Sequence, residues 1–230
     1  MQNRRRAVPF DPEYFARRVA AGDEVTALAA FRHAYATNHW AGAESPSGPG
    51  SSFEQTDAIR RGLPALCRRL EVRTLLDLPC GDCSWMATID LGVERYIGAD
   101  FLPELIEANR RRYAGSGREF QVLDLLSSPL PAADLVLCRD CLVHLSFADI
   151  NRAIANLRKA RALYLLTTTF PAQSTNEDIH TGDWRPLNLE VAPFHWPPPQ
   201  DILIEGCTEG SGLFADKSLG LWRGDALAGS

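Results

Sequence analysis

The sequence has no long hydrophobic run and no excess of positive charge. No stretch approaches the roughly 18 consecutive apolar residues of a membrane-spanning helix, and no apolar segment follows the first arginines as it would in a secretory signal. The formal net charge is −5, which argues against nucleic acid as a partner. The basic cluster Arg4, Arg5 and Arg6 is interpreted as a solvated terminus rather than a binding arm.

Two glycine-rich phosphate-binding patterns are also missing. The sequence contains neither G-x-G-x-x-G nor G-x-x-x-x-G-K-[ST]. The turn expected after the first strand, residues 79–83, offers a single glycine, Gly81. Because a pyrophosphate must approach the backbone of such a turn closely, a cofactor without phosphate is favoured.

Cysteine is sparse, with six residues in 230, and no export signal accompanies it, so reduced thiols in a cytoplasmic protein are expected. The C-x-x-C pairs Cys80/Cys83 and Cys138/Cys141 raise the alternatives of a zinc site and a redox centre. The 54 residues between the pairs far exceed the spacing of common zinc motifs, and Asp82 beside the first pair disfavours a thiolate. We interpret these cysteines as small apolar side chains that line a cofactor site.

The N-terminal part of the chain is expected to be mainly helical. One helix is predicted over residues 11–36, where apolar residues recur at helical spacing. Residues 38–52 are rich in Gly, Pro and Ser and are either a linker or a mobile lid, and Trp40 favours the lid. A further helix is predicted to begin at Ser52, with Gln55 completing a capping box.

From residue 73 onward, expected strands and helices alternate in one domain. The strands are predicted at 74–79, 95–101, 119–125, 134–140 and 162–170, and the helices at 84–89, 103–113 and 147–160. The strands are nearly continuous apolar runs, which is typical of parallel strands buried on both faces. Such units predict an α/β fold with a doubly wound parallel sheet, followed by two last strands at 201–207 and 217–223.

Acidic residues end three successive strands of this predicted sheet. They are Asp77, Asp100 and Asp124. Ligands of doubly wound sheets bind at the carboxyl ends of the strands, and Asp100 follows Asp77 by 23 residues, close to the spacing of about 20 expected for a ribose-binding acid. Asp77 could instead cap the following turn, but the repetition favours a cofactor site.

These motifs resemble those of the class I S-adenosylmethionine (SAM)-dependent methyltransferases. The segment LLDLPCGDC is similar to their first motif: Asp77, Cys80 and Gly81 match, whereas Pro79 and Cys83 stand where glycines are usual. YIGADF, VLDLL and LCRDCLVHLS resemble the motifs that follow. The resemblance implies SAM as cofactor and a Rossmann-like seven-stranded sheet of order 3-2-1-4-5-7-6, with the last two strands as an antiparallel pair.

The resemblance also implies a role for each region. Residues 1–70 would form a helical lid region, 71–170 the SAM-binding core, and 171–230 an acceptor loop with the last two strands. Asp100 would bind the ribose hydroxyls and Asp124 the adenine amino group. The residues expected to bind SAM are Trp40, Ser52, Asp77, Pro79, Cys80, Gly81, Trp85, Asp100, Phe101, Asp124, Leu125 and Arg139.

His144 is the expected general base, because LCRDCLVHLS resembles the segment that faces the transferred methyl group and imidazole titrates in a suitable range. A buried structural histidine is the alternative interpretation. His180 and His195 are weaker rivals for the role. Asp140 could act as the base, orient His144 or bind a metal.

A divalent metal is left open as a second cofactor. Metal-dependent O-methyltransferases of this fold place acids after the fourth and fifth strands. Asp140 supplies the first acid, but the segment TTTFP supplies no second. Mg²⁺ would therefore need Asp178 or Asp183.

Several segments, among them NHW, SPSGPGSS, TTTFP and TGDWRPLNL, also resemble a bacterial group of sugar O-methyltransferases. The resemblance implies methylation of a sugar or oligosaccharide hydroxyl in polysaccharide biosynthesis, with the 1-hydroxyl of a methylated mannoside as the particular acceptor. Aromatic rings suit the C–H faces of a pyranose, and the residues expected to bind it are Asp183, Trp184, Arg185, Asn188 and Trp196. The alternatives are an N-methyltransferase of a small amine and a non-catalytic SAM-binding protein.

Overall fold

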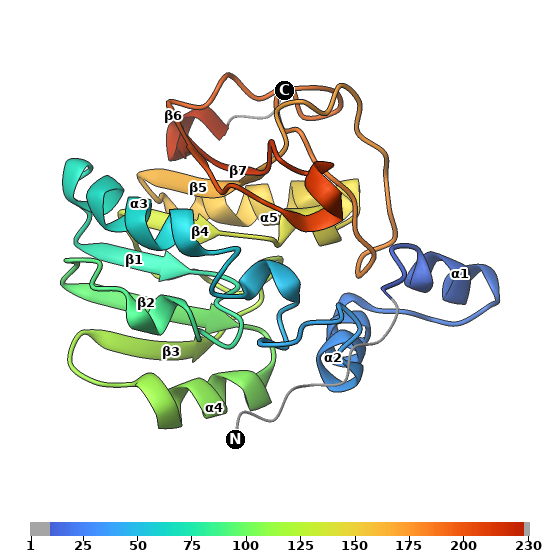
Figure 1. Cartoon of the computed structure of the whole chain (residues 1–230), viewed down its shortest axis with the longest axis horizontal. Coiled ribbons are helices and arrows are strands. Elements are labelled where there is room, and N and C mark those ends of the chain that lie inside the picture. The colour runs from blue at the N-terminus through green and yellow to red at the C-terminus, as the bar shows by residue number, and fades with distance from the viewer. Residues whose placement is uncertain (1–9, 228–230) are drawn as a thin grey trace.

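A computed structural model describes residues 10–227 of the chain, so the arginine cluster at residues 4–6 lies outside the described residues. Seven strands form one sheet in the order β3-β2-β1-β4-β5-β7-β6 (Figure 1). Strands β1 to β5 run parallel, and β7 lies antiparallel between β5 and β6. The predicted order and the antiparallel last pair are confirmed. The strands are β1 (Thr74–Asp77), β2 (Arg95–Asp100), β3 (Arg118–Val122), β4 (Leu135–Cys138), β5 (Tyr164–Thr169), β6 (Asp201–Ile204) and β7 (Ser218–Arg223).

Five α-helices and five short 3₁₀ helices are found in the described residues. The α-helices are α1 (Tyr14–Ala20), α2 (Ala27–Thr37), α3 (Asp57–Arg69), α4 (Pro103–Tyr113) and α5 (Phe147–Ala160). The 3₁₀ helices are Pro49–Ser51, Met86–Thr88, Leu142–His144, Glu209–Gly212 and Gly224–Leu227. No helix in this part of the chain is long and apolar enough to cross a membrane.

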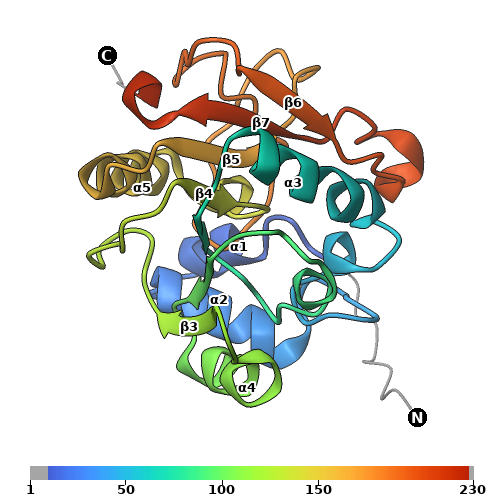
Figure 2. The ribbon, with the colours of Figure 1, turned by 90° about the vertical axis from the view of Figure 1, so that its left-hand side faces the viewer.

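Two apolar cores lie on opposite faces of the sheet. Because successive side chains of a strand point to opposite faces, Leu75 belongs to one core and Leu76 to the other. Leu63 of α3 and Ile106 of α4 pack on the first face, and Ile150 of α5 packs on the second. Figure 2 shows α3 and α5 on the two sides of the sheet. Both faces of the sheet are thus buried. Because β1 to β5 run parallel, their carboxyl ends lie at one edge of the sheet.

The helix predicted over residues 11–36 is divided into α1 and α2. Gly22 takes a left-handed conformation with φ +97°, which ends the first helix. The Thr26 hydroxyl then accepts the N–H of Ala29 (3.2 Å) and caps the second. Both helices lie beyond the carboxyl ends of the parallel strands, apart from the sheet (Figure 1).

Helix α3 begins at Asp57 and not directly after Ser52, so the predicted capping box is wrong as a helix start. The Ser52 hydroxyl does accept the N–H of Gln55 (3.2 Å), but only within a turn that precedes the helix. The Gln55 side-chain amide donates to the Thr208 hydroxyl (2.6 Å) instead of returning to Ser52. A hydrogen bond to Thr208, distant in the sequence, therefore takes the place of the local bond between Gln55 and Ser52 that a capping box requires.

Candidate active site

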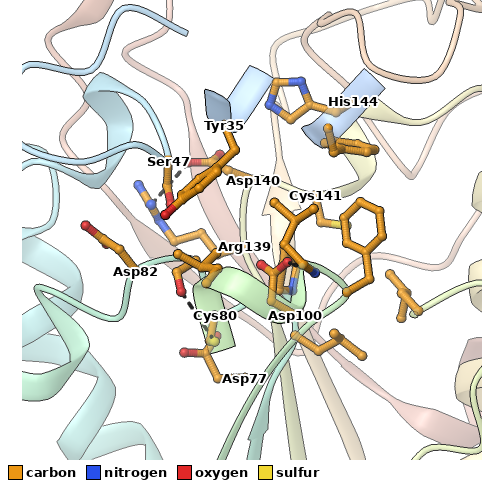
Figure 3. Close-up of a pocket in the computed structure, with 18 of the residues that line it drawn as sticks. Tyr35, Ser47, Asp77, Cys80, Asp82, Asp100, Arg139, Asp140, Cys141 and His144 are labelled. Carbon is orange, nitrogen blue, oxygen red and sulfur yellow. Dashed lines mark hydrogen bonds and ion pairs between the residues drawn. The ribbon is translucent and has the colours of Figure 1, made fainter. Parts of the chain in front are cut away.

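A cavity of about 1140 Å³, space open to solvent included, lies at the carboxyl ends of the parallel strands. Asp77 ends β1, Asp100 ends β2 and Asp124 follows β3, and all three line this cavity. Figure 3 shows Asp77 and Asp100 on one side of the pocket and His144 on the other. The acids meet because β2 pairs in parallel with both β1 and β3.

A glycine and a buried asparagine shape the turn after β1. Gly81 has φ +53°, and a Cβ at this position would lie 2.4 Å from the Ser47 hydroxyl. Asn109 of α4, which sequence analysis missed, donates to the Gly81 carbonyl (2.7 Å) and is 1% exposed. The glycine of this motif is therefore needed both for its backbone conformation and for close packing of the 38–52 segment.

Two of the three carboxylates are costly to ionise. Asp77 accepts the Tyr96 hydroxyl (2.6 Å), and burial raises the pKa of Asp77 to about 7. Asp100 accepts the N–H of Leu102 (3.1 Å), and burial raises its pKa to about 6. A ligand that donates hydrogen bonds to Asp100 would offset this cost, as a ribose diol can.

The Asp124 carboxylate already has partners within the chain. One oxygen accepts the N–H of Leu126 (2.8 Å), and the other accepts the Ser127 hydroxyl (2.6 Å). These bonds close the turn after β3 and orient the carboxylate at the cavity wall. Each oxygen has one such partner and can accept a further hydrogen bond from a ligand.

Aromatic residues of the N-terminal region roof the cavity. Phe31 of α2 contacts Phe101 (ring centroids 5.4 Å apart) and Trp40 (6.0 Å), and Tyr35 lines the same cavity. The indole Nε1 of Trp40 is buried and has no hydrogen-bond partner among residues 10–227, which leaves a donor for a ligand. Sequence analysis missed Phe31 and Tyr35, because their helical spacing is equally typical of a packed helix face.

His144 lies between this cavity and a second one, and its ring lines both. The ring packs against Trp40 with centroids 4.9 Å apart. Its Nδ1 lies 2.8 Å from the carbonyl oxygen of Asp183. Since a carbonyl can only accept, Nδ1 carries the proton and Nε2 keeps its lone pair. Burial lowers the pKa of His144 to about 4, so the ring is neutral at pH 7.

Asp140 belongs to a buried group of charges next to His144. Its Oδ2 accepts Lys217 Nζ (2.8 Å) and lies 3.1 Å from Arg139 Nη1, and Arg139 Nη2 donates to Glu205 (2.7 Å). Burial opposes ionisation of Asp140, yet Arg139 and Lys217 hold its pKa well below the usual range. Asp140 is consequently a weaker proton acceptor than His144.

The second cavity, of about 970 Å³ with space open to solvent included, is lined by both aromatic and charged residues. Its aromatic lining residues include Phe170, Trp184 and Phe214, and its charged lining residues are Asp140, Glu209 and Lys217. Because Trp40 and His144 line both cavities, the two spaces meet at these two side chains. The imidazole of His144 therefore borders both spaces, and a ligand in either cavity would lie beside it.

Most residues predicted to bind an acceptor have other partners. Asp183 accepts two N–H groups in the first turn of α1 (2.8 and 2.9 Å), and Arg185 donates to two carbonyls of the 142–145 turn (2.9 and 2.8 Å). Asn188 donates to the carbonyl of residue 173 (2.9 Å), and Trp196 packs on the tryptophan of β7 (5.2 Å). Of the five, Trp184 alone lines the second cavity. The other four line neither cavity and satisfy the backbone or core of an irregular segment, so their role in binding an acceptor stays a prediction.

The acids expected to hold Mg²⁺ do not converge. Asp178 accepts the N–H of Phe147 (2.7 Å), Asp183 fixes α1, and Asp140 faces Lys217. Among the described residues, no group of three or more His, Cys, Asp or Glu side chains could hold a metal ion. Dependence on Mg²⁺ stays a prediction.

Nearly all the residues predicted to bind SAM line the first cavity. They are Trp40, Asp77, Pro79, Cys80, Gly81, Trp85, Asp100, Phe101, Asp124, Leu125 and Arg139. Ser52 does not line it, although the neighbouring Ser51 does. Cys80 is a free thiol whose pKa is raised by burial, which agrees with a lining role and not a reactive one. Of the rival histidines, His195 is exposed and His180 lies near the Val25 carbonyl (3.3 Å).

A seven-stranded sheet of this order, with acids at the ends of successive strands, defines the Rossmann-like methyltransferase fold. Residues 75–162 match a protein family described as a methyltransferase domain. The match and the fold together support a methyltransferase domain.

Solved structures share the fold at low sequence identity. The methyltransferase domain of a bacterial CtHen1-C has a TM-score of 0.55 at 12% identity, covering 74% of this chain and 98% of that one. The N-methyltransferase NodS from Bradyrhizobium japonicum has a TM-score of 0.50 at 17% identity, covering 73% and 98%. Human N-acetylserotonin methyltransferase in complex with SAM has a TM-score of 0.52 at 13% identity, covering 94% and 60%. Comparison with curated proteins finds no match.

Proposed function

We propose that the protein transfers a methyl group from SAM to a hydroxyl of a sugar or oligosaccharide. The observation that carries the proposal is the position of His144, whose ring lines both the strand-end cavity and the second, aromatic cavity. A neutral imidazole between a cofactor site and an acceptor site can take the proton that an attacking hydroxyl must lose.

The strand-end cavity carries groups that fit SAM. Asp100 would accept hydrogen bonds from the ribose hydroxyls, and Asp124 would accept one from the adenine amino group. Phe101 and Leu125 give the cavity an apolar wall suited to the adenine ring. The indole N–H of Trp40, which lacks a partner among the described residues, would donate to a ligand at the junction of the cavities.

When bound there, SAM would supply an activated methyl group: a bond would form between the acceptor oxygen and the methyl carbon as the carbon–sulfur bond breaks, and the electron pair of the broken bond would leave with S-adenosylhomocysteine (SAH). The Nε2 of His144 takes the hydroxyl proton, while its Nδ1 remains bonded to the Asp183 carbonyl and fixes the ring. The negative charge of Asp140 favours the imidazolium that forms. Trp40 covers the reacting atoms and excludes water.

The particular acceptor that we propose is a mannoside with a free anomeric 1-hydroxyl. A hemiacetal hydroxyl is more acidic than an ordinary alcohol, so it demands less of a base whose pKa is lowered to about 4. Trp184 and Phe214, with ring centroids 5.0 Å apart, offer apolar surface to a pyranose ring. The resemblance of the sequence to sugar O-methyltransferases supports the same acceptor.

N-methylation of a small amine is the second candidate. NodS, which shares the fold, is described as an N-methyltransferase. In this chain, Asp140 and Glu209 both line the second cavity, and their carboxylates could attract an ammonium group. An ammonium group must also lose a proton before attack, so the two candidates differ in the acceptor and not in the use of His144.

Labelled-methyl transfer to a panel of acceptors tests the proposal. The panel contains mannose and mannooligosaccharides with a free reducing end, the same sugars blocked as methyl glycosides, and small amines. We expect label on the reducing sugars and at least a tenfold lower rate on the blocked ones. Labelling of amines alone would favour the second candidate, and SAM binding with no transfer would favour a non-catalytic SAM-binding protein.

Residues 38–52 should become harder to cleave when SAM binds, because Trp40 and Ser51 of this segment line the cofactor cavity. Glu44 is exposed and gives a Glu-specific protease a site within the segment. We expect SAM to slow cleavage at Glu44 at least fivefold. Cleavage at the exposed Glu71, after α3, should keep its rate and serves as the internal control. Equal rates at Glu44 with and without SAM would contradict a closing lid.

A further inference from the structure

The loop between β6 and β7, residues 205–217, contributes more to the second cavity than the segment predicted to bind the acceptor. Cys207, Glu209, Gly210, Phe214 and Lys217 line that cavity, whereas Trp184 is the one described residue of 171–200 that does. We propose that loop 205–217 selects the acceptor by holding a neutral pyranose between the Phe214 ring and the charged pair Glu209 and Lys217. The inference rests on the proposed function and identifies the residues of its acceptor site.

Phe214 completes an aromatic wall of three rings. Its ring meets Trp184 at 76° with centroids 5.0 Å apart, and meets Phe170 at 80° with centroids 6.0 Å apart. Phe170 and Trp184 are themselves edge to face at 6.2 Å. Each ring is therefore held by the other two, and together they give a preformed apolar surface against which the C–H face of a pyranose can pack.

Charged residues of the same cavity offer both a hydrogen-bond donor and an acceptor. Lys217 is 5% exposed, and its ammonium group is held by Asp140 (2.8 Å) and Glu205 (3.5 Å). Glu209, which is half-buried, presents a carboxylate to the same cavity. A hydroxyl group both donates and accepts, so it matches this pair.

The charges around this cavity disfavour an anionic acceptor. Three carboxylates, on Asp140, Glu205 and Glu209, oppose an anionic group, and the cations of Arg139 and Lys217 offset them only in part. The carboxylates outnumber the cations by one, so a sugar acid should be rejected more strongly than an amino sugar. A neutral sugar does not meet this repulsion.

The loop is anchored at several points and does not depend on a ligand for its shape. Its ends are joined by the hydrogen bond from Glu205 N–H to the Lys217 carbonyl (3.1 Å). Thr208 is held by the side chain of Gln55 (2.6 and 3.2 Å), and Asp216 accepts the N–H of Ala172 (2.8 Å). Preformed groups lose little conformational entropy on binding, which suits a specificity element.

Steady-state kinetics on three variants test the inference. Phe214→Ala should raise the KM for the neutral sugar at least tenfold and leave SAM affinity within twofold. Phe214→Leu, which keeps apolar bulk, should show a smaller rise. Leu213→Ala is the matched control, because Leu213 is the neighbouring residue and is 75% exposed. Similar KM values for Phe214→Ala and Leu213→Ala would overturn the role of the ring.

Glu209→Gln tests the charge selection. The wild type should prefer mannose over mannuronate by at least tenfold in kcat/KM, and the variant should narrow that ratio at least threefold. An unchanged ratio would overturn the role of Glu209. If the wild type methylates the sugar and the Phe214 and Glu209 variants do so with unchanged kinetics, this inference is overturned and the proposed function is not. A wild type that binds SAM but methylates no sugar overturns the proposed function, and the inference with it.

Discussion

Replacing His144 with alanine should lower kcat at least a hundredfold while SAM affinity stays within about twofold. A positioned general base contributes about 10²- to 10⁴-fold, and the predicted ribose and adenine contacts, Asp100 and Asp124, are different residues. The size of the loss also reports on the acceptor. A loss in kcat near a hundredfold fits an acidic anomeric hydroxyl, and a loss near 10⁴-fold fits an ordinary alcohol.

His195→Ala is the matched control for this experiment, because His195 is an exposed histidine that lines neither cavity described here. It should keep wild-type kcat. Circular dichroism and SAM calorimetry establish that His144→Ala is folded and binds the cofactor. A folded His144→Ala variant with near wild-type kcat and an unchanged pH profile would show that another group, or solvent, takes the proton.

The pH dependence of the reaction should differ from that of an ordinary histidine. The neutral ring is the active form, and burial lowers its pKa to about 4, so at saturating SAM the kcat/KM for the acceptor should rise with pH through about 4 and be level by pH 6. An unperturbed histidine would place this limb near 6.5. His144→Ala should lose the limb. Because the pKa of His144 is lower in the folded state than in the unfolded state, the neutral ring stabilises the fold fully above about pH 6.5, and this stabilisation is lost as pH falls toward 4. The enzyme is therefore less stable at the acidic end of the profile, so rates should be measured as initial rates.

The sheet could be predicted because each strand is a short local run of apolar residues in the sequence. Leu75 and Leu76 are both apolar because both faces of β1 are covered, and acids recur where strands end. The helix over residues 11–36 was less predictable. Its apolar spacing continues through the break, and only the conformation of Gly22 and the cap at Thr26 separate α1 from α2.

The residues predicted to bind the cofactor lie together for a similar reason, although their role in binding SAM stays a prediction. Its acids occupy the strand ends that parallel pairing brings to one edge. The charged group beside His144 has no such local signal. Arg139 and Glu205 are 66 positions apart, and Asp140 and Lys217 are 77 apart, so the pairings of β4 with β5, β5 with β7 and β7 with β6 are what bring them together. No spacing rule could have assembled that group.

The acceptor side was harder to predict because polar residues in an irregular segment have two possible uses. Asp183 and Arg185 looked like sugar-binding residues, but an irregular backbone has donors and acceptors that must be satisfied when buried. Asp183 serves α1 and Arg185 serves the turn that carries His144. Composition cannot distinguish these uses, whereas the cavity lining can.

Replacing Asp100 with alanine should weaken SAM binding at least tenfold, with kcat at saturating SAM nearly unchanged. Asp100 ends β2, is 5% exposed and lines the cofactor cavity, and hydrogen bonds to a charged group contribute about 1.5–3 kcal/mol each. Asp100→Asn should lose less affinity, because the amide oxygen still accepts. Asp90→Ala removes an exposed acid from the loop before β2 and should leave calorimetric SAM affinity unchanged.

The pH dependence of SAM binding separates a direct contact of Asp100 from a structural role. Burial raises the pKa of Asp100 to about 6, so the carboxylate that accepts two hydroxyl donors forms as pH rises through about 6. Wild-type affinity should therefore increase between pH 5 and pH 7. In Asp100→Asn this limb should be absent, because the side chain no longer titrates. That variant should also lose no stability relative to the wild type at pH 8, where the wild type carries the cost of an ionised buried carboxylate. If folded Asp100→Ala and Asp100→Asn both bind SAM with wild-type affinity and wild-type pH dependence, the ribose hydroxyls are held by another group.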